Sequence, residues 1–278
     1  MKLLKFIQRY WLDAVALVVV GFIFILPFAF ILLMASKTSA EAALFEFSWP
    51  SQFKLVENIT AVMQFSNYRM VLAIWNSLLL TVSSVTFIVL FAALVAYTMQ
   101  RRNDRMASAV SLILFAGLVL PPAVAPTVFF LQKLGLYKTL FSLLLIEVAL
   151  ALPFAVVTLR AFIGTIPREI DEAAIMDGAS PLRMFFSIIL PLLRPALVTI
   201  IVTSSIGIYN DFANPLYFLP GAKNVTAQLT LFSFLGQFGS QWNMVFADVV
   251  VLTIPPLIMF MIFQRQIVSG MTSGAVKG

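Results

Sequence analysis

A charged segment between residues 160 and 183 stands out in a chain that is otherwise mostly apolar. Its charged side chains are four acids and three arginines: Glu169, Asp171, Glu172, Asp177, Arg160, Arg168 and Arg183. The chain contains no Cys and no His, which excludes thiolate chemistry, histidine-dependent serine triads and metal or haem centres built on these ligands. The segment is instead the place where this chain can bind a water-soluble partner.

Two short helices around a tight break are expected to position these charges. Pro167 suits the first turn of a helix, where its missing N–H has no cost, and good helix formers follow over Arg168–Met176. The acids near the N-terminal end favour the helix dipole. Gly178 can adopt the left-handed conformation that ends such a helix, and Ser180-Pro181 is typical of an N-cap and a first turn. The second helix then has an apolar face formed by Phe185, Ile188 and Ile189.

This segment resembles the EAA motif of ABC importer permeases at every position of the usual spacing. The matching residues are Glu172-Ala173-Ala174, Asp177-Gly178-Ala179, Phe185, Ile188 and Leu190-Pro191. The resemblance implies a cytoplasmic loop over about residues 165–189 that couples the membrane helices to a separate ATPase. The residues that would carry this coupling are Glu172, Ala173, Ala174, Asp177, Gly178, Ala179, Pro181 and Phe185. The alternative is a solvated loop that only joins two membrane helices.

Composition indicates an integral membrane protein. Of the 278 residues, 61% are hydrophobic and 11% are charged, and the mean hydropathy is +1.01. A soluble domain needs far more charge to cover its surface, so the excess of apolar side chains must face lipid. Neither half of the chain has a soluble composition, and we therefore expect one membrane domain over residues 1–278.

Hydropathy predicts an all-α fold with six membrane-spanning helices, because about 20 apolar residues cross a hydrocarbon core of about 30 Å. The expected spans are about 14–35, 74–97, 106–131, 140–162, 190–213 and 242–263. The first is too long for the apolar part of a cleaved signal peptide, and no convincing cleavage site follows it. Pro121, Pro122 and Pro126 are expected to break the third span in its second half. The polar segment 36–73 matches no motif.

The distribution of basic residues predicts that both termini are cytoplasmic. With this orientation twelve of the 18 Lys and Arg residues lie inside and six lie outside, in agreement with the positive-inside rule. The loop that contains Lys133 and Lys138 goes against the rule. Because the net charge of +6 follows the sides of the membrane, it does not indicate a nucleic-acid partner. The same orientation places residues 165–189 on the cytoplasmic side, where an ATPase would be.

Further motifs resemble the carbohydrate-uptake branch of these permeases, and its MalG-type members in particular. They are Asn76-Ser77, Pro153-Phe154, Tyr209-Asn210-Asp211 and the ending from Gly270 to Gly278. The resemblance covers essentially the whole chain and implies the type I permease fold in a bacterial inner (cytoplasmic) membrane. It also implies a heterodimer with a MalF-type permease, two ATP-binding-cassette ATPase subunits, and an extracytoplasmic binding protein that delivers a sugar or sugar-like solute.

The chain lacks the residues that would let it bind and hydrolyse ATP itself. A P-loop ends in Gly-Lys-Ser/Thr, because glycine amides and the lysine cradle the phosphates. No Gly-Lys dipeptide occurs in this sequence. We therefore expect no cofactor in this chain and no enzymatic activity, with ATP bound and hydrolysed by partner subunits.

Three residues near the outer end of the fifth span are candidates for the solute path: Tyr209, Asn210 and Asp211. An aromatic face with amide and carboxylate groups suits a sugar, but Asn210 and Asp211 also suit a helix cap. Two further acids lie within or near the spans. Glu147 is expected to be paired at a helix interface, and Asp248 is close enough to the outer interface to be solvated.

Two other classes of membrane protein are alternatives. An ATP-independent secondary transporter or channel would use Glu147, Asp211 and Asp248 as an ion path, since acids within the membrane are functional candidates. It would show an inverted repeat, of which the sequence has no convincing sign. An intramembrane enzyme would need an Asp or Ser-Lys dyad, and no such pair of motifs stands out.

Overall fold

The computed structural model describes residues 2–221, 224–235 and 241–275, and these ranges contain helices and no strand. The helices are α1 (Lys2–Ala35), α2 (Ser39–Ala42), α3 (Leu55–Arg101), α4 (Arg105–Val119), α5 (Val124–Lys133), α6 (Leu140–Ile163), α7 (Glu169–Met176), α8 (Pro181–Met184), the π-helix η1 (Phe185–Ile189), α9 (Leu190–Leu192), α10 (Arg194–Asn210), α11 (Ala213–Phe218), the 3₁₀-helix η2 (Ala227–Ser233) and α12 (Trp242–Ala275). The predicted all-α fold is confirmed. Part of the C-terminal motif, residues 276–278, lies outside the described residues.

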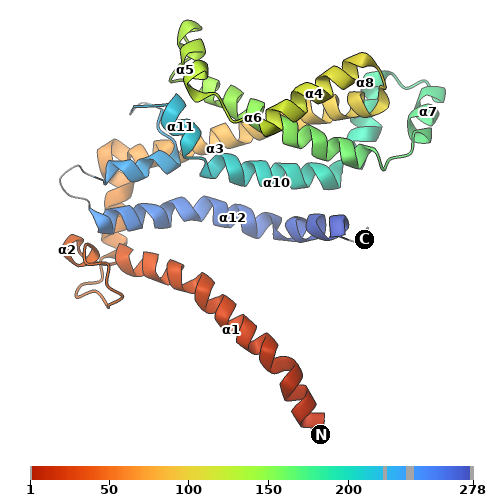
Figure 1. The fold of residues 1–278 in the computed structure, drawn as a ribbon. Coiled ribbons are helices and arrows are strands. Elements are labelled where there is room, and N and C mark those ends of the chain that lie inside the picture. Colours follow the sequence, from red (N-terminus) through yellow and green to blue (C-terminus); the bar gives the residue numbers. More distant parts are fainter. Residues whose placement is uncertain (1, 222–223, 236–240, 276–278) are drawn as a thin grey trace. The chain divides into compact units, whose positions relative to one another are not determined.

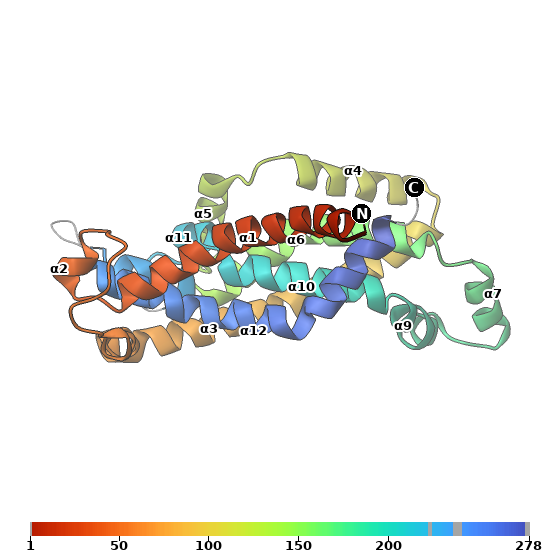
Figure 2. The same ribbon diagram turned by 90° about the horizontal axis from the view of Figure 1, so that it is seen from below.

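The chain divides into two compact units. The first consists of Met1–Val71 and Thr230–Ile254, and the second of Leu72–Leu229 and Pro255–Gly278. The segment that resembles the EAA motif and the candidate path residues all belong to the second unit. In both views α7 lies beyond the ends of α4, α6 and α10 of this unit, whereas α5 and α11 lie at its opposite end (Figures 1 and 2).

Four of the described helices are long and apolar enough to cross a membrane: Val15–Ala35 of α1, all of α3 and α6, and Trp242–Gln264 of α12. Two bent pairs raise the number to six if each pair forms one span. They are α4 with α5, bent by 115°, and Pro181–Leu192 with α10, bent by 75°. Four to six candidate spans agree with the six that hydropathy predicts.

The break between α4 and α5 confirms the expected effect of the proline residues. Leu120 has φ −76° and ψ 132°, an extended conformation, because a residue that precedes a proline is disfavoured in the helical region. Pro121 and Pro122 lie in the gap between the two helices, whereas Pro126 lies in the first turn of α5, where its missing N–H costs little. The break thus comes at the first two prolines and not at the third.

The segment 36–73, for which the sequence offered no motif, belongs to the first unit up to Val71 and is largely helical. Thr38 caps α2 with a capping box that involves Glu41. Lys37 is only 1% exposed, and its Nζ donates to the Glu46 carbonyl at 2.6 Å and to Ser48 Oγ at 3.1 Å. Helix α3 already begins at Leu55 and is interrupted at Phe65–Tyr68, so it starts well before the predicted span.

Close helix packing in the second unit explains the placement of α4 against α6. A Cβ on Gly117 of α4 would lie only 3.1 Å from Pro153 Cγ of α6, so any larger residue would require Pro153 to move by a few tenths of an ångström. The core of the unit is apolar, and its fully buried members include Ile88, Leu143, Leu159, Ile163, Ile189 and Leu193. Because Ile189 and Leu193 lie just before α10, this core also holds the chain that follows α7 and α8.

Candidate functional site

Helix α7 begins with three acids in its first turn, Glu169, Asp171 and Glu172, where carboxylates stabilise the positive end of the helix dipole. Arg168 occupies the N-cap position without a side-chain capping bond. The expectation that Pro167 lies within the first turn is wrong, because this residue precedes the N-cap and lies just outside the helix. A shift of one or two residues at a helix end leaves the predicted element itself unchanged.

The break after α7 is built as the sequence predicts. Gly178 has φ +74°, the left-handed conformation that glycine adopts without a steric penalty. The amide of Gly178 donates to the Ile175 carbonyl at 2.9 Å, and the amide of Ala179 donates to the Ala174 carbonyl at 2.9 Å. These two bonds form a Schellman motif, which satisfies the last carbonyls of α7 and turns the chain sharply.

The second short helix also starts at the expected residues. Ser180 is the N-cap, its Oγ accepts from the Arg183 amide at 3.3 Å, and Pro181 occupies the first turn. The continuation differs from the expected α-helix, because Phe185–Ile189 form a π-helix in which the Leu190 amide donates to the Phe185 carbonyl. No residue type in the sequence predicts a π-helix at these positions. Phe185 and Ile189 are buried and Ile188 is half-buried, so the predicted apolar face is confirmed.

The α7–α8 segment presents an outer surface that carries both charge and apolar area. Glu172, Ala173 and Asp177 are exposed. Beside them lie apolar side chains that proteins usually bury, Ile175, Met176 and Leu182, which are 61%, 87% and 68% exposed. An apolar centre with charged residues next to it, on a helix capped at its end, is suited to docking in a groove of another protein.

The inner surface of α7 is anchored to the end of α3. Asp171 accepts a hydrogen bond from Tyr97 Oη at 2.9 Å and forms an ion pair with Arg101, whose Nε lies 2.6 Å from Asp171 Oδ2. The carboxylate and guanidinium side chains are only 12% and 16% exposed. Arg101 also donates to the Ile166 carbonyl at 3.3 and 3.4 Å, so one arginine holds both α7 and the chain that leads into it.

Sequence reasoning missed this anchor. The sequence places Asp171 among the acids of the segment and Arg101 among the basic residues on one side of the membrane, and it does not indicate that the two side chains meet. The sequence does contain one indication of the anchor. Tyr97 and Arg101 are four residues apart and therefore lie on one face of α3.

The candidate path residues lie at the end of α10 and just before α11, and α11 is at the end of the second unit opposite to α7 (Figures 1 and 2). Tyr209 is 1% exposed, whereas Asn210 is exposed and its Oδ1 accepts from Gln228 at 3.3 Å. Asp211 Oδ1 accepts from the amides of Ala213 and Asn214 at 2.9 and 3.3 Å, so this side chain caps the start of α11. The sequence suggested a cap on the end of the fifth span, and the bonds of Asp211 are instead at the start of the helix that follows.

Two acids inside the predicted spans are buried and hydrogen-bonded. Glu147 of α6 is 6% exposed and accepts from Asn214 Nδ2 at 3.3 Å, which agrees with the expected pairing at a helix interface. Asp248 of α12, in the first unit, is fully buried, and both of its oxygens accept from Thr230 Oγ1, at 3.1 and 3.0 Å. The interpretation of Asp248 as a solvated residue is therefore wrong, because η2 supplies its partner and excludes water.

The apolar helices define a multi-pass membrane protein, and the capped α7–α8 segment at their ends carries both charge and exposed apolar area. Residues 88–273 match the family described as binding-protein-dependent transport system inner membrane components, and the protein belongs to this family. The match begins within α3 and includes the whole α7–α8 segment. The protein is thus a permease component of an inner-membrane transport system.

Two curated relatives illustrate the similarity. The melibiose/raffinose/stachyose import permease protein MelC of Bacillus subtilis (strain 168) is 32% identical over 206 residues, which are 73% of this chain and 75% of that protein. The probable starch degradation products transport system permease protein AmyC of Thermoanaerobacterium thermosulfurigenes is 29% identical over 273 residues, which are 98% of each chain. The similarity therefore extends beyond the family match to nearly the full length.

A solved structure has the same fold. The crystal structure of a bacterial ABC transporter involved in the import of the acidic polysaccharide alginate contains a chain that superposes with a TM-score of 0.78 at 21% identity. The superposition covers 91% of this chain and 94% of that chain. At this identity the likeness establishes the permease fold and nothing about the solute.

Proposed function

We propose that this protein is the MalG-type permease subunit of an ABC importer for a sugar or sugar-like solute. With a MalF-type second permease it forms an alternating-access path, a binding protein outside the membrane delivers the solute, and two separate ATPase subunits supply the energy. The observation that carries this proposal is the α7–α8 segment, with its Schellman turn at Gly178 and its exposed charged and apolar surface. The family membership supports the same assignment.

The names of the relatives support a sugar as the class of solute. MelC is named for melibiose, raffinose and stachyose, and AmyC for the degradation products of starch. These are neutral oligosaccharides, which need hydrogen-bonding groups along the path but no compensating charge. Tyr209, Asn210 and Asp211 are our candidates for that path in this subunit, although Asp211 also caps α11.

The anchor at Asp171 supports a mechanical role for α7. The exposed side of the helix, including Glu172, docks on an ATPase, while the buried side is joined to α3 through Arg101 and Tyr97. Closure of the two ATPase subunits would then move α7 and the end of α3 together as a rigid body. Rigid-body motion of membrane helices about a central site is how alternating access is achieved in transporters.

The alternative function, an ATP-independent secondary transporter or channel, has less support. Glu147 and Asp211 could contribute to an ion path, but Glu147 accepts from Asn214 and Asp211 accepts from backbone amides at the start of α11. These bonds give both acids a structural task. A coupling segment anchored to a membrane helix has no purpose in a transporter that needs no ATPase.

We expect the purified chain alone neither to bind nor to hydrolyse ATP, because it lacks a P-loop. Reconstitution with its ATPase, second permease and binding protein should give ATP turnover that rises when a sugar-loaded binding protein is added. The measurement is phosphate release by the chain alone and by the complex. Turnover by the isolated chain that persists when the P-loop lysine of the ATPase is mutated would contradict the proposal.

We further expect the coupling segment and both termini to face the cytoplasm. The chain has no Cys, so single cysteines report without background. Met176→Cys, at a residue that is 87% exposed, should react with an impermeant maleimide only from the inside. The matched control is Trp49→Cys, at a residue that is 86% exposed in a loop expected outside, and it should react only from the outside. Labelling of Met176→Cys in intact cells would show that the orientation is reversed.

A further inference from the structure

A cavity of about 460 Å³ lies among α3, α4 and α6 in the second unit, close to the end that carries α7. Its wall is mainly apolar, with Leu114 and Phe115 from α4 and Val156 from α6. Phe115 is 53% exposed, so this wall reaches the outer surface of the unit. The apolar character suits a hydrocarbon chain, yet one side of the cavity carries a positive charge.

That charge belongs to Arg160, which lies one turn before the end of α6. Its Nε donates to Gln100 Oε1 at 3.1 Å and its Nη1 donates to Ser111 Oγ at 2.9 Å. Both acceptors are neutral, and among the described residues no carboxylate forms an ion pair with Arg160. The guanidinium is thus held in place while its charge has no counterpart within the described chain.

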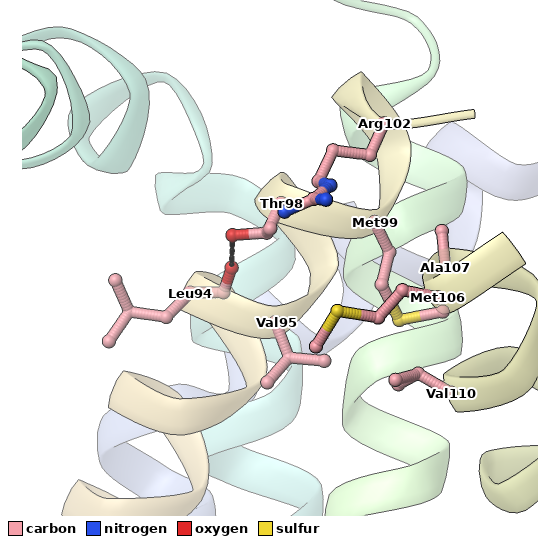
Figure 3. A pocket seen from close by; sticks show the side chains of 8 residues that line it. All are labelled: Leu94, Val95, Thr98, Met99, Arg102, Met106, Ala107 and Val110. Atoms are coloured by element: carbon pink, nitrogen blue, oxygen red, sulfur yellow. Dashed lines mark hydrogen bonds between the residues drawn. The ribbon is translucent and has the colours of Figure 1, made fainter. Parts of the chain in front are cut away.

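A neighbouring cavity provides a useful contrast. Figure 3 shows this cavity of about 260 Å³, which is lined by apolar side chains of α3 and α4, including Val95 and Met106, with Arg102 at its edge. Here the arginine already has a carboxylate partner, because Arg102 forms an ion pair with Asp104. The two cavities therefore differ in one respect that matters for an anion: of these two arginines, Arg102 has a carboxylate partner, whereas Arg160 has none among the described residues.

We propose that the cavity at Arg160 binds an anionic phospholipid from the leaflet on the side of the coupling segment. The phosphate accepts hydrogen bonds from guanidinium N–H groups that Gln100 and Ser111 leave free, and an acyl chain lies along the apolar wall of Leu114, Phe115 and Val156. An arginine in a membrane span must reach an anion or water, and basic pockets between membrane helices bind anionic head groups. The inference rests on the membrane location and not on which solute is carried.

The experiment uses the assembled importer complex, purified with its second permease and ATPase. Dioleoyl phosphatidylglycerol and dioleoyl phosphatidylcholine are titrated separately, and bound lipid is counted by native mass spectrometry. Arg160→Gln removes the charge, and Arg102→Gln is the matched control, because Arg102 is already paired. Ala161→Trp keeps the charge but fills the cavity from an exposed position on its lining, so it tests the site without altering the arginine.

The wild-type complex should bind phosphatidylglycerol more tightly than phosphatidylcholine. Arg160→Gln should weaken binding of phosphatidylglycerol about fivefold, the effect of losing roughly 1 kcal/mol for one arginine near a membrane surface. Ala161→Trp should lose the bound lipid, and Arg102→Gln should match the wild type. Equal binding by wild type and Arg160→Gln would overturn the proposal. Loss of the second permease from Arg160→Gln, with lipid binding unchanged, would instead identify the cavity as a contact between subunits and would also overturn it.

Discussion

Gly178→Val should abolish solute uptake while the complex still assembles in the membrane. The glycine has φ +74°, and a β-branched residue strongly disfavours this conformation. No atom lies within 4 Å of the position that a Cβ would take, so the cost is one of backbone conformation and not of steric overlap. Strain of this kind costs on the order of 1–3 kcal/mol. Relief of that strain would open the Schellman turn and redirect α7, whose exposed face meets the ATPase in the complex that we propose.

The measurement is uptake beside ATP turnover in the purified complex, after confirming that the subunit ratio is retained. The Val variant should lose uptake and should hydrolyse ATP without response to the binding protein. Gly178→Asn is the matched control, because asparagine tolerates left-handed conformations far better than valine. It should retain most of the uptake. Normal uptake by Gly178→Val would show that the α7–α8 segment only connects two membrane helices.

Asp171→Ala should uncouple ATP hydrolysis from transport, whereas Glu172→Ala, at the next residue, should have a much smaller effect. Asp171 is buried and paired with Arg101, while Glu172 is exposed. Removal of one partner from a buried ion pair costs about 3–5 kcal/mol, because the other charge is left without compensation. An exposed ion pair or rim charge contributes only about 0–1 kcal/mol. Asp171→Ala therefore tests the ion pair between α7 and α3 within the permease. Glu172→Ala tests the exposed surface that is proposed to dock on the ATPase.

Two measurements distinguish a purely structural role of Asp171 from a role in coupling: basal ATP turnover, and its stimulation by the binding protein. If α7 transmits motion through Asp171, the Ala variant should keep basal ATP turnover but lose its stimulation by the sugar-loaded binding protein. The double variant Arg101→Met/Asp171→Leu removes both charges and should recover part of the stimulation, since apolar pairs often replace buried ion pairs at little cost. Full stimulation and uptake in Asp171→Ala would show that the joint to α3 is not needed for coupling.

The local features of the α7–α8 segment could be predicted because neighbouring residues determine them. Gly178 ends α7, and Ser180 with Pro181 starts α8, as propensity and capping rules require. The break at Pro121 and Pro122 follows from the chemistry of proline in the same way. Each of these features depends on a few consecutive residues, so the sequence contains all the information needed.

Features that depend on distant residues could not be predicted. The hydrogen bond between Tyr97 and Asp171 joins positions 74 residues apart, and no local pattern shows that the end of α3 meets α7. The burial of Asp248 likewise depends on η2, which brings Thr230 to it from 18 residues away. Hydropathy shows that a side chain is near the membrane boundary but not which neighbouring element covers it. The helix that begins at Leu55 is a further example, because Asn58 in its first turns donates to the carbonyls of Ala35 and Lys37, which are 23 and 21 residues away.

The π-helical turn at Phe185–Ile189 bears on how the length of this segment can vary during evolution. A π-turn holds one residue more than the α-helical turn that would connect the same two helices. Deletion of one residue within it would restore α-helical winding and leave the directions of the flanking helices nearly unchanged. A deletion within α7 would instead rotate the following residues by about 100° around the helix axis, because an α-helix has about 3.6 residues per turn. Gain or loss of a single residue is therefore most easily absorbed at the π-turn, between the docking surface and the membrane helix α10.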